Sequence, residues 1–182
     1  MIRWDRARLW SNQKAAPRVY FRWATPADAD KEYLSWIQDP EVLRWLSFPS
    51  HRVVDLRTYI RSQVNKGSAV AFFIIHQRDR WIGGAKHGQP IYPNPRVDPR
   101  IGTLKLVKEK NGSATLGLIL GRARGNGLGV EAINLACQFA KDRWGIKQVE
   151  CGIHAENERS IRAFTKAGFT IRPKTVWGTR VS

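Results

Sequence analysis

The stretch Arg122–Gly129, R-A-R-G-N-G-L-G, holds three glycines in eight residues and stands between two segments of different pattern. Before it, Ala114–Leu120 is a strand-like apolar run, and after it apolar residues recur at helical spacing as far as Trp144. Glycine has no Cβ, so the backbone N–H groups of such a turn stay uncovered and several can converge on one anion. The N-terminus of the following helix adds about half a positive charge. The stretch therefore predicts a seat for a phosphate group.

This turn differs from the two common nucleotide-binding loops. No Lys-Ser or Lys-Thr pair follows the glycines, as a P-loop requires. Val130 stands where the dinucleotide-binding fingerprint has its last small residue. A tight turn with a helix cap, without any ligand, is the alternative explanation of the glycines, and Glu131 is expected to support the turn or its helix.

Apolar and alternating runs on both sides of this turn predict the strands of a sheet. Val70–Ile75 is apolar without interruption, which is typical of a strand covered on both faces. Ile101–Val107 and Ala114–Leu120 are joined through Asn111-Gly112, the strongest short signal of an antiparallel hairpin. Four further runs favour strands: Arg18–Trp23, Lys147–Ile153, Phe169–Arg172 and Val176–Val181.

Four helices are expected between these strands. Thr25-Pro26-Ala27-Asp28 combines an N-cap hydroxyl, a proline at the first helical position and an acid in the first turn. Asp39-Pro40 ends that helix, and a second is expected over about Asp55–Val64. The helix after the glycine turn is apolar over much of its girth and should be deeply buried. The last runs from about Glu158 to Ala167 and ends at Gly168.

The 182 residues are the length of one domain, and the predicted order of elements is β, α, α, β, β, β, α, β, α, β, in which the last β stands for the two closing runs Phe169–Arg172 and Val176–Val181. A hairpin combined with strand–helix–strand units predicts an α/β fold with a mixed, partly antiparallel sheet. We expect a single domain over residues 1–182 with its core at about 18–172. Residues 77–99, which hold four prolines and three glycines, are expected to form a long loop with a short strand at Trp81-Ile82.

Composition narrows the class of protein. Lysine and arginine exceed aspartate and glutamate by 31 to 15, giving +16, which implies an anionic partner. The charge is spread along the chain, and only residues 25–40 are net acidic, so phosphorylated small ligands fit at least as well as nucleic acid, which is not favoured. No apolar run approaches a membrane helix, and Met1–Trp10 does not resemble an export signal, so a cytoplasmic protein is expected. Cys137 and Cys151, the only cysteines, exclude a disulfide framework.

A second informative segment lies about thirty residues after the glycine turn, at Asn157–Phe169, N-E-R-S-I-R-A-F-T-K-A-G-F. Together with Arg124-x-x-Gly127-x-Gly129 it resembles the GNAT superfamily of acetyl-CoA-dependent N-acetyltransferases. Within that superfamily, the chain looks most like the branch of ribosomal-protein N-terminal and sugar-nucleotide amine acetyltransferases, over about Arg18 to Phe169. The resemblance implies the GNAT fold with helices on both faces of the sheet, acetyl-CoA as cosubstrate and no metal.

The resemblance also implies a binding mode for acetyl-CoA. The strands at 114–120 and 147–153 would part, and the pantetheine arm would lie between them, using free backbone groups of Leu118 and Leu120. Residues 124–129 would hold the pyrophosphate. The cosubstrate-binding residues expected from this likeness are Leu118, Ile119, Leu120, Arg124, Gly125, Asn126, Gly127, Leu128, Gly129, Asn157, Phe164 and Lys166. Three of these also have plain structural explanations: a helix cap for Asn157, a core side chain for Phe164 and a solvated face for Lys166.

The implied reaction is direct attack of a neutral amine on the thioester carbonyl, which needs a proton acceptor for the amine and a proton donor for the thiolate. Many relatives have a tyrosine donor where this sequence has Phe164, which has no proton to give. Ser160 is therefore the candidate donor, unless its hydroxyl only serves the helix start. Glu150 and His154 are the candidate bases, because they share one face of a strand bordering the expected cleft. His87 and Glu41 come next.

The acceptor amine stays open at this point. A strongly cationic protein repels polycationic aminoglycosides, whereas a nucleotide-linked amino sugar, or a protein N-terminus presented beside ribosomal RNA, suits the charge. A different class of function is a non-catalytic basic module of the same fold that associates with RNA. Surface tryptophans such as Trp4, Trp10 and Trp45 are compatible with a homodimer interface, so a monomer and a homodimer are both expected alternatives.

Overall fold

A computed structural model describes residues 18–46, 51–78, 96, 98–171 and 177–181. Its centre is one seven-stranded sheet of order β1-β2-β3-β4-β5-β7-β6, in which β4 and β5 are the only parallel neighbours. The mixed, partly antiparallel sheet is thus confirmed. The strands are β1 (Val19–Trp23), β2 (Val70–Gln77), β3 (Arg100–Lys108), β4 (Ala114–Leu120), β5 (Gln148–Gly152), β6 (Thr170–Ile171) and β7 (Trp177–Val181).

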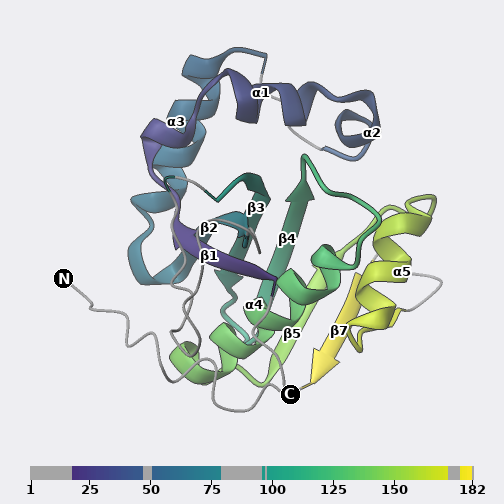
Figure 1. Cartoon of the computed structure of the whole chain (residues 1–182). Helices are drawn as coiled ribbons and strands as arrows, with labels where there is room; N and C mark the ends of the chain where they lie inside the picture. The colour runs from purple at the N-terminus through teal and green to yellow at the C-terminus, as the bar shows by residue number, and fades with distance from the viewer. Residues whose placement is uncertain (1–17, 47–50, 79–95, 97, 172–176, 182) are drawn as a thin grey trace, which may run out of the picture.

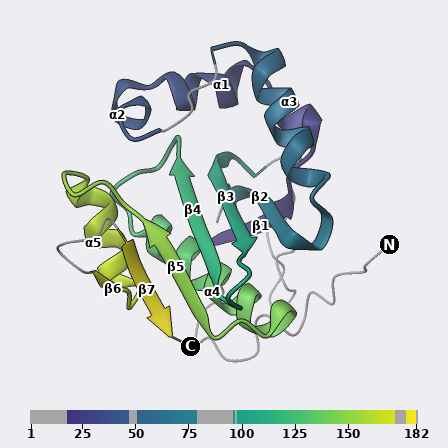
Figure 2. The ribbon, with the colours of Figure 1, turned by 180° about the vertical axis from the view of Figure 1, so that it is seen from behind.

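Helices cover both faces of this sheet, as the α/β prediction requires (Figures 1 and 2). One face carries α1 (Lys31–Gln38) and α3 (Val53–Val64), and the other carries α4 (Leu128–Trp144) and α5 (Glu158–Lys166). The short helix α2 (Pro40–Leu43) follows α1 and lies beyond the carboxyl end of β4. Two 3-10 turns, Pro26–Asp28 and Gly67–Ala69, complete the described elements.

The sheet separates two hydrophobic cores. In β2 the side chains of Phe73 and Ile75 pack into the α4–α5 core, while those of Phe72 and Ile74 pack into the α1–α3 core. Successive side chains of a strand point to opposite faces, so a strand buried on both sides reads as an unbroken apolar run. The prediction that Val70–Ile75 is a strand covered on both faces is confirmed.

The first helix begins later than Thr25 predicts. Residues 26–28 form a 3-10 turn, and α1 starts only after Asp30, whose side chain accepts a hydrogen bond from the Tyr33 N–H at 2.9 Å. The reason lies in Asp28, whose carboxylate accepts from the Thr25 N–H at 2.8 Å and forms an ion pair with Arg22 of β1. These bonds hold the turn against the strand, so the helix restarts beyond it.

The two later helices match their predictions in place but differ in detail. Helix α3 covers the expected segment and buries Leu56 and Ile60, whereas Tyr59 and Val64, which share the helical spacing, are 38% and 41% exposed. Helix α4 is buried over much of its surface, as its sequence predicts. Between Gln77 and Pro99, residues 79–95 and 97, with the strand expected at Trp81-Ile82 and with His87, lie outside the described residues.

Strands β4 and β5 meet only at their first residues. Their pairing consists of Ala114 with Val149 and Thr115 with Glu150. Beyond these two pairs the strands diverge toward their carboxyl ends, as Figure 2 shows. The strand expected to end at Ile153 ends at Gly152, so His154 belongs to the segment between β5 and α5.

Candidate functional site

A cavity of about 960 Å³ lies where β4 and β5 part. One side of it is formed by the end of β4, the glycine turn, the segment after β5 and α5. The other side is formed by α1, α2, α3 and the neighbouring strands β2 and β3. After the roles that the sequence resemblance leads us to expect, we call these the cofactor side and the acceptor side. The sequence-predicted residues that line the cavity are Glu41, Leu118, Ile119, Leu120, Arg124, Gly125, Gly127, Gly129, His154, Asn157, Ser160, Phe164 and Lys166.

The diverging end of β4 directs peptide groups into the gap. In an antiparallel pair only alternate residues exchange backbone hydrogen bonds with the partner strand. The Gly121 N–H donates to the Ile101 carbonyl at 2.9 Å, so in the same register the odd-numbered residues of β4 bond to β3. The peptide groups of Leu118 and Leu120 therefore point toward β5, beyond the last paired residues of the two parallel strands.

The glycine turn has the open backbone that its sequence predicts. Gly125 and Gly127 adopt the left-handed region, with φ +89° and +78°, and Gly127 is the N-cap of α4. A Cβ at Gly125 would meet nothing within 4 Å, so the turn is not filled by side chains there. Gly129 lets the helix approach β4, because a Cβ would lie 3.2 Å from Leu120 Cδ1. The uncovered turn at the start of a buried helix suits a phosphate group.

The outer side of the turn is fixed by Arg18 and Glu131. The Arg18 Nε–H donates to Glu131 Oε1 at 2.6 Å, and the Arg18 backbone N–H donates to Glu131 Oε2 at 2.9 Å. The Arg18 guanidinium also donates to the Asn126 carbonyl at 2.9 Å. Asn126 and Leu128 do not line the cavity; Leu128 is a buried core residue. Glu131 thus supports the turn from behind, as its sequence position suggests.

Arg124 spans the two sides of the cavity. Its Nε–H donates to the Leu120 carbonyl at 2.8 Å, and its guanidinium forms an ion pair with Asp39 Oδ2 at 2.6 Å. The Leu120 carbonyl is therefore occupied by a side chain, contrary to the expectation that it is free for the cosubstrate, whereas Leu118 keeps its open position. Asp39 also caps α2 by accepting from the Glu41 N–H at 2.9 Å. This bond and the Arg124 ion pair lower the pKa of Asp39.

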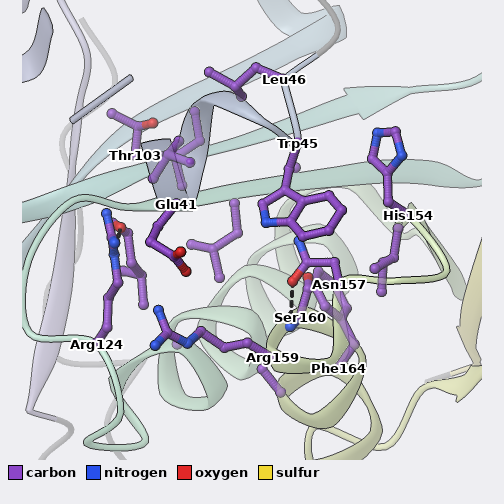
Figure 3. A pocket seen from close by; sticks show the side chains of 18 of the residues that line it. Glu41, Trp45, Leu46, Thr103, Arg124, His154, Asn157, Arg159, Ser160 and Phe164 are labelled. Atoms are coloured by element: carbon purple, nitrogen blue, oxygen red, sulfur yellow. Dashed lines mark hydrogen bonds between the residues drawn. The ribbon is translucent and has the colours of Figure 1, made fainter. Parts of the chain in front are cut away.

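Helix α5 brings the second sequence motif to the cavity. Asn157 is its N-cap, because Oδ1 accepts from the Ser160 N–H at 3.1 Å, so the cap explanation of Asn157 holds (Figure 3). The side chains of Asn157 and Ser160 also line the cavity. Phe164 is 3% exposed and packs edge-on against Phe169, with ring centroids 5.0 Å apart, so it belongs to the core as well as to the cavity wall.

The candidate bases separate in space. His154 lines the cavity and lies against Trp45, with ring centroids 5.6 Å apart (Figure 3). The carboxylate of Glu41 points into the cavity from α2, between Arg124 and Arg159 (Figure 3). Glu150 does not line the cavity: it pairs with Thr115 at the closed end of the two strands and accepts a hydrogen bond from Gln148 at 2.7 Å.

The acceptor side contains residues that sequence reasoning missed. Trp45, considered above only as an interface residue, lines the cavity together with Tyr59 and Lys105. A lysine between Leu104 and Leu106 in an apolar strand is a signal that could have marked Lys105. Nothing comparable marks Trp45. The lining is cationic in balance, since six Lys or Arg side chains (Arg44, Lys105, Arg124, Arg159, Arg162 and Lys166) face three carboxylates (Glu41, Glu156 and Glu158).

Comparison with known proteins agrees with this geometry. A family model described as "Acetyltransferase (GNAT) domain" matches residues 18–170. Comparison with curated proteins gave no match. Three solved structures with TM-scores of 0.65–0.67 serve as examples. One is an aminoglycoside acetyltransferase with coenzyme A and kanamycin, which is 17% identical and has a TM-score of 0.67 over 90% of this chain and 94% of that one.

The second is a spermidine N-acetyltransferase from Vibrio cholerae with CoA and spermine, 12% identical, with a TM-score of 0.65 over 89% of this chain and 92% of that one. The third is a microcin C7 self-immunity acetyltransferase with acetyl-CoA and AMP, 16% identical, with a TM-score of 0.67 over 91% and 93%. At these identities the likeness concerns the fold.

Within the described ranges, no helix has the length and apolar character to cross a bilayer, and no three His, Cys, Asp or Glu side chains form a metal-binding group.

Proposed function

Since the chain belongs to the acetyltransferase (GNAT) family, we propose that acetyl-CoA binds between β4 and β5 and that an amine acceptor enters from α1–α3, so that the acetyl group passes directly from one to the other. The observation that carries this proposal is the early end of β4–β5 pairing beside an uncovered glycine turn. The open peptide groups of Leu118 would bond the pantetheine arm, and the turn with the N-terminus of α4 would hold the pyrophosphate.

The transfer needs two proton movements, and the cavity offers groups for both. The thioester supplies the activated acetyl group, and its carbonyl carbon is attacked by the neutral amine. The Ser160 hydroxyl would donate a hydrogen bond or a proton to the departing thiolate, because it lines the cavity on α5. His154 or Glu41 would take the proton of the amine, directly or through water. Glu150 is not proposed as the base, because it lies outside the cavity lining.

The charge of the cavity favours an acceptor amine that also carries negative charge. On the side of α1–α3 and β3, two cationic side chains, Arg44 and Lys105, face one carboxylate, Glu41, and this balance would repel polycations such as aminoglycosides and polyamines, although neighbours of the same fold act on them. A nucleotide-linked amino sugar, or a protein N-terminus, suits this lining better. The neighbour solved with AMP shows that the fold is compatible with a nucleotide ligand, at 16% identity.

Thermal unfolding with and without ligand tests the binding site. Acetyl-CoA and CoA should each raise the Tm, because a ligand that binds only the folded state stabilises it. Gly125→Glu should abolish the shift, because a Cβ at Gly125 meets nothing within 4 Å and the carboxylate would occupy the proposed phosphate seat. Gly112→Glu is the matched control: Gly112 also has a left-handed φ, +81°, and open space around it, but it lies in the β3–β4 turn. Equal loss of the ligand shift in both variants would argue against the seat.

A screen of acceptors identifies the amine. Release of free CoA thiol would be followed with amino sugars, nucleotide-linked amino sugars, N-terminal peptides, polyamines and aminoglycosides. We expect the greatest turnover with nucleotide-linked amino sugars and N-terminal peptides, and the least with the polycations, which are the polyamines and aminoglycosides. Preference for a polyamine would overturn the argument from charge while leaving acetyl transfer itself intact.

A further inference from the structure

Lys105 is a charged residue in the middle of the sheet. It lies in β3 between Leu104 and Leu106, both fully buried, and its own side chain projects into the cavity on the acceptor side. In the β3–β4 register it stands directly opposite Gly117. A Cβ at Gly117 would meet nothing within 4 Å, so the glycine leaves open space beside the lysine. The sheet thus places the ammonium group of Lys105 in the open part of the cavity next to Gly117.

The ammonium group of Lys105 has a neutral partner. Its Nζ donates to the Tyr59 hydroxyl at 2.9 Å and lies 5.4 Å from the centroid of the Tyr59 ring. Within the described chain no carboxylate lies within ion-pair distance of it, although arginine side chains of the described residues form ion pairs, as Arg18 does with Glu131 and Arg124 with Asp39. Edge-on packing against Phe72, with ring centroids 6.1 Å apart, helps to fix the Tyr59 ring.

This pairing leaves hydrogen-bond donors available. Because the Tyr59 oxygen accepts from Lys105, the phenolic O–H is free to donate, and the ammonium group retains two further N–H groups. An ammonium and a hydroxyl that face the same space form a site for an oxyanion, since hydrogen bonds from a charged donor are the strong ones. A carboxylate partner from the protein would have neutralised this charge, and the described part of the chain supplies none.

We propose that Lys105 and Tyr59, with the space above Gly117, form a subsite for a phosphate or carboxylate group carried by the amine acceptor. The inference rests on the proposed function, because it assigns one part of the acceptor to one part of the same cavity. The subsite lies on the acceptor side of the sheet and is separate from the glycine turn, which is proposed for the pyrophosphate of acetyl-CoA. The subsite therefore contributes to the choice of acceptor and not to cosubstrate binding.

Lys105→Met tests the subsite, because methionine keeps an unbranched side chain and removes the charge. Lys108→Met is the matched control: it makes the same change of charge three residues along the same strand, where Lys108 lies over the Trp144 ring and does not line the cavity. Tyr59→Phe removes only the hydroxyl. Binding of inorganic phosphate would be measured by calorimetry on the protein saturated with CoA, at constant ionic strength.

Phosphate should bind the CoA complex of the parent protein and of Lys108→Met alike, and about tenfold or more weakly to Lys105→Met, as expected for the loss of one charge-assisted hydrogen bond. Tyr59→Phe should weaken it by a smaller factor. Equal weakening by both lysine variants would mean a general effect of net charge and would overturn the subsite. Absence of phosphate binding in a protein that binds CoA would overturn it too, without touching the proposed function. Absence of CoA binding would overturn the proposed function instead.

Two pairs of acceptors distinguish the sources of the oxyanion. Glucosamine 6-phosphate is compared with glucosamine, and a Ser-Glu peptide with the corresponding Ser-Gln peptide. In whichever pair is acetylated, the parent enzyme should prefer the anionic member in kcat/KM, and Lys105→Met should lose about tenfold of that preference while Lys108→Met keeps it. A preference for the anionic member that is equal in both lysine variants, or a preference for the neutral member in the parent, would overturn the assignment.

Discussion

The two sides of the cavity are built from different materials. The cofactor side is formed mainly by backbone groups, which belong to the open end of β4, the glycine turn and the first turns of α4 and α5. On the acceptor side, side chains converge from α1, α2, α3 and β3. A site formed by backbone groups can be recognised from a short stretch of sequence, because it needs glycines and helix caps. A site formed by side chains depends on which distant elements the fold brings together. The cofactor side should therefore tolerate little backbone change, and the acceptor side should govern specificity.

The largest effect should come from Ser160, the side chain on the cofactor side that is proposed to serve the departing thiolate. Ser160→Ala should lower kcat on the order of 100-fold with little change in the KM for acetyl-CoA, because the donor to the thiolate is lost. Steady-state kinetics with the acceptor found in the screen measure this. Thr165→Ala is the control, since Thr165 is an exposed hydroxyl of the same helix outside the cavity lining. A loss of less than about threefold in Ser160→Ala would remove the donor assignment.

The next largest effect is expected on stability, where α1 of the acceptor side packs on the end of β4 of the cofactor side. Trp36 of α1 packs so closely on Gly121, at the end of β4, that a Cβ there would overlap its indole ring. Gly121→Ala should therefore lower the free energy of unfolding by about 1–3 kcal/mol, as is usual for overpacking. Urea unfolding measures it. Gly117→Ala, four residues earlier with open space around the Cβ, should cost less. Equal losses would mean that contact with Trp36 does not join the sides.

A smaller effect is expected at the ion pair that crosses the cavity. Asp39→Asn retains a side-chain oxygen that can cap α2 but loses the charge that pairs with Arg124. We expect a several-fold rise in the KM for the acceptor, because α2 carries Glu41 and leads to Trp45. Asp39→Ala removes the cap as well and should raise it further. If neither variant alters the acceptor KM while both alter that for acetyl-CoA, the pair belongs to the cofactor side alone.

The smallest effect concerns pH and involves the strands next to the acceptor side. His76 is fully buried, with Nδ1 2.8 Å from the Asp98 carbonyl and Nε2 accepting from the Arg22 Nε–H at 3.1 Å. Burial, assisted by the Arg22 charge, lowers the pKa of His76 below its ordinary value of 6.5. The unfolded chain therefore binds a proton more readily than the folded one, and stability should fall as the pH drops below about 6.5.

Urea unfolding between pH 7.5 and pH 5 would measure how the free energy of unfolding changes with pH. His76→Gln should reduce this change. His154→Gln is the control for loss of an exposed histidine. A parent protein whose unfolding free energy is constant over that range would show that His76 does not titrate differently in the two states. The carboxylate of Asp28 would contribute only at lower pH: burial alone would raise its pKa, but bonds from Arg22 and Thr25 outweigh burial and lower it.

The sequence predicts the backbone features of the cofactor side better than the side-chain contacts that join it to the acceptor side. The strands, the hairpin and the buried helix α4 follow from apolar periodicity, and the glycine turn and Asn157 follow from local motifs. The partners of Arg124 do not, because Asp39 lies 85 residues away and was visible only as a helix end. Glu150 and His154 were grouped by strand alternation, but β5 ends at Gly152, so they separate. Local patterns predict backbone geometry, whereas convergence of side chains requires the fold.

The parting of β4 and β5 has a consequence for the lifetime of the protein. Under the proposed function, the pantetheine arm takes the place of a missing neighbour along the outer part of β4, as an added strand would. Enzyme molecules that carry the cosubstrate should then resist proteolysis longer than those without it. The abundance of the enzyme in a cell would thereby follow the supply of acetyl-CoA.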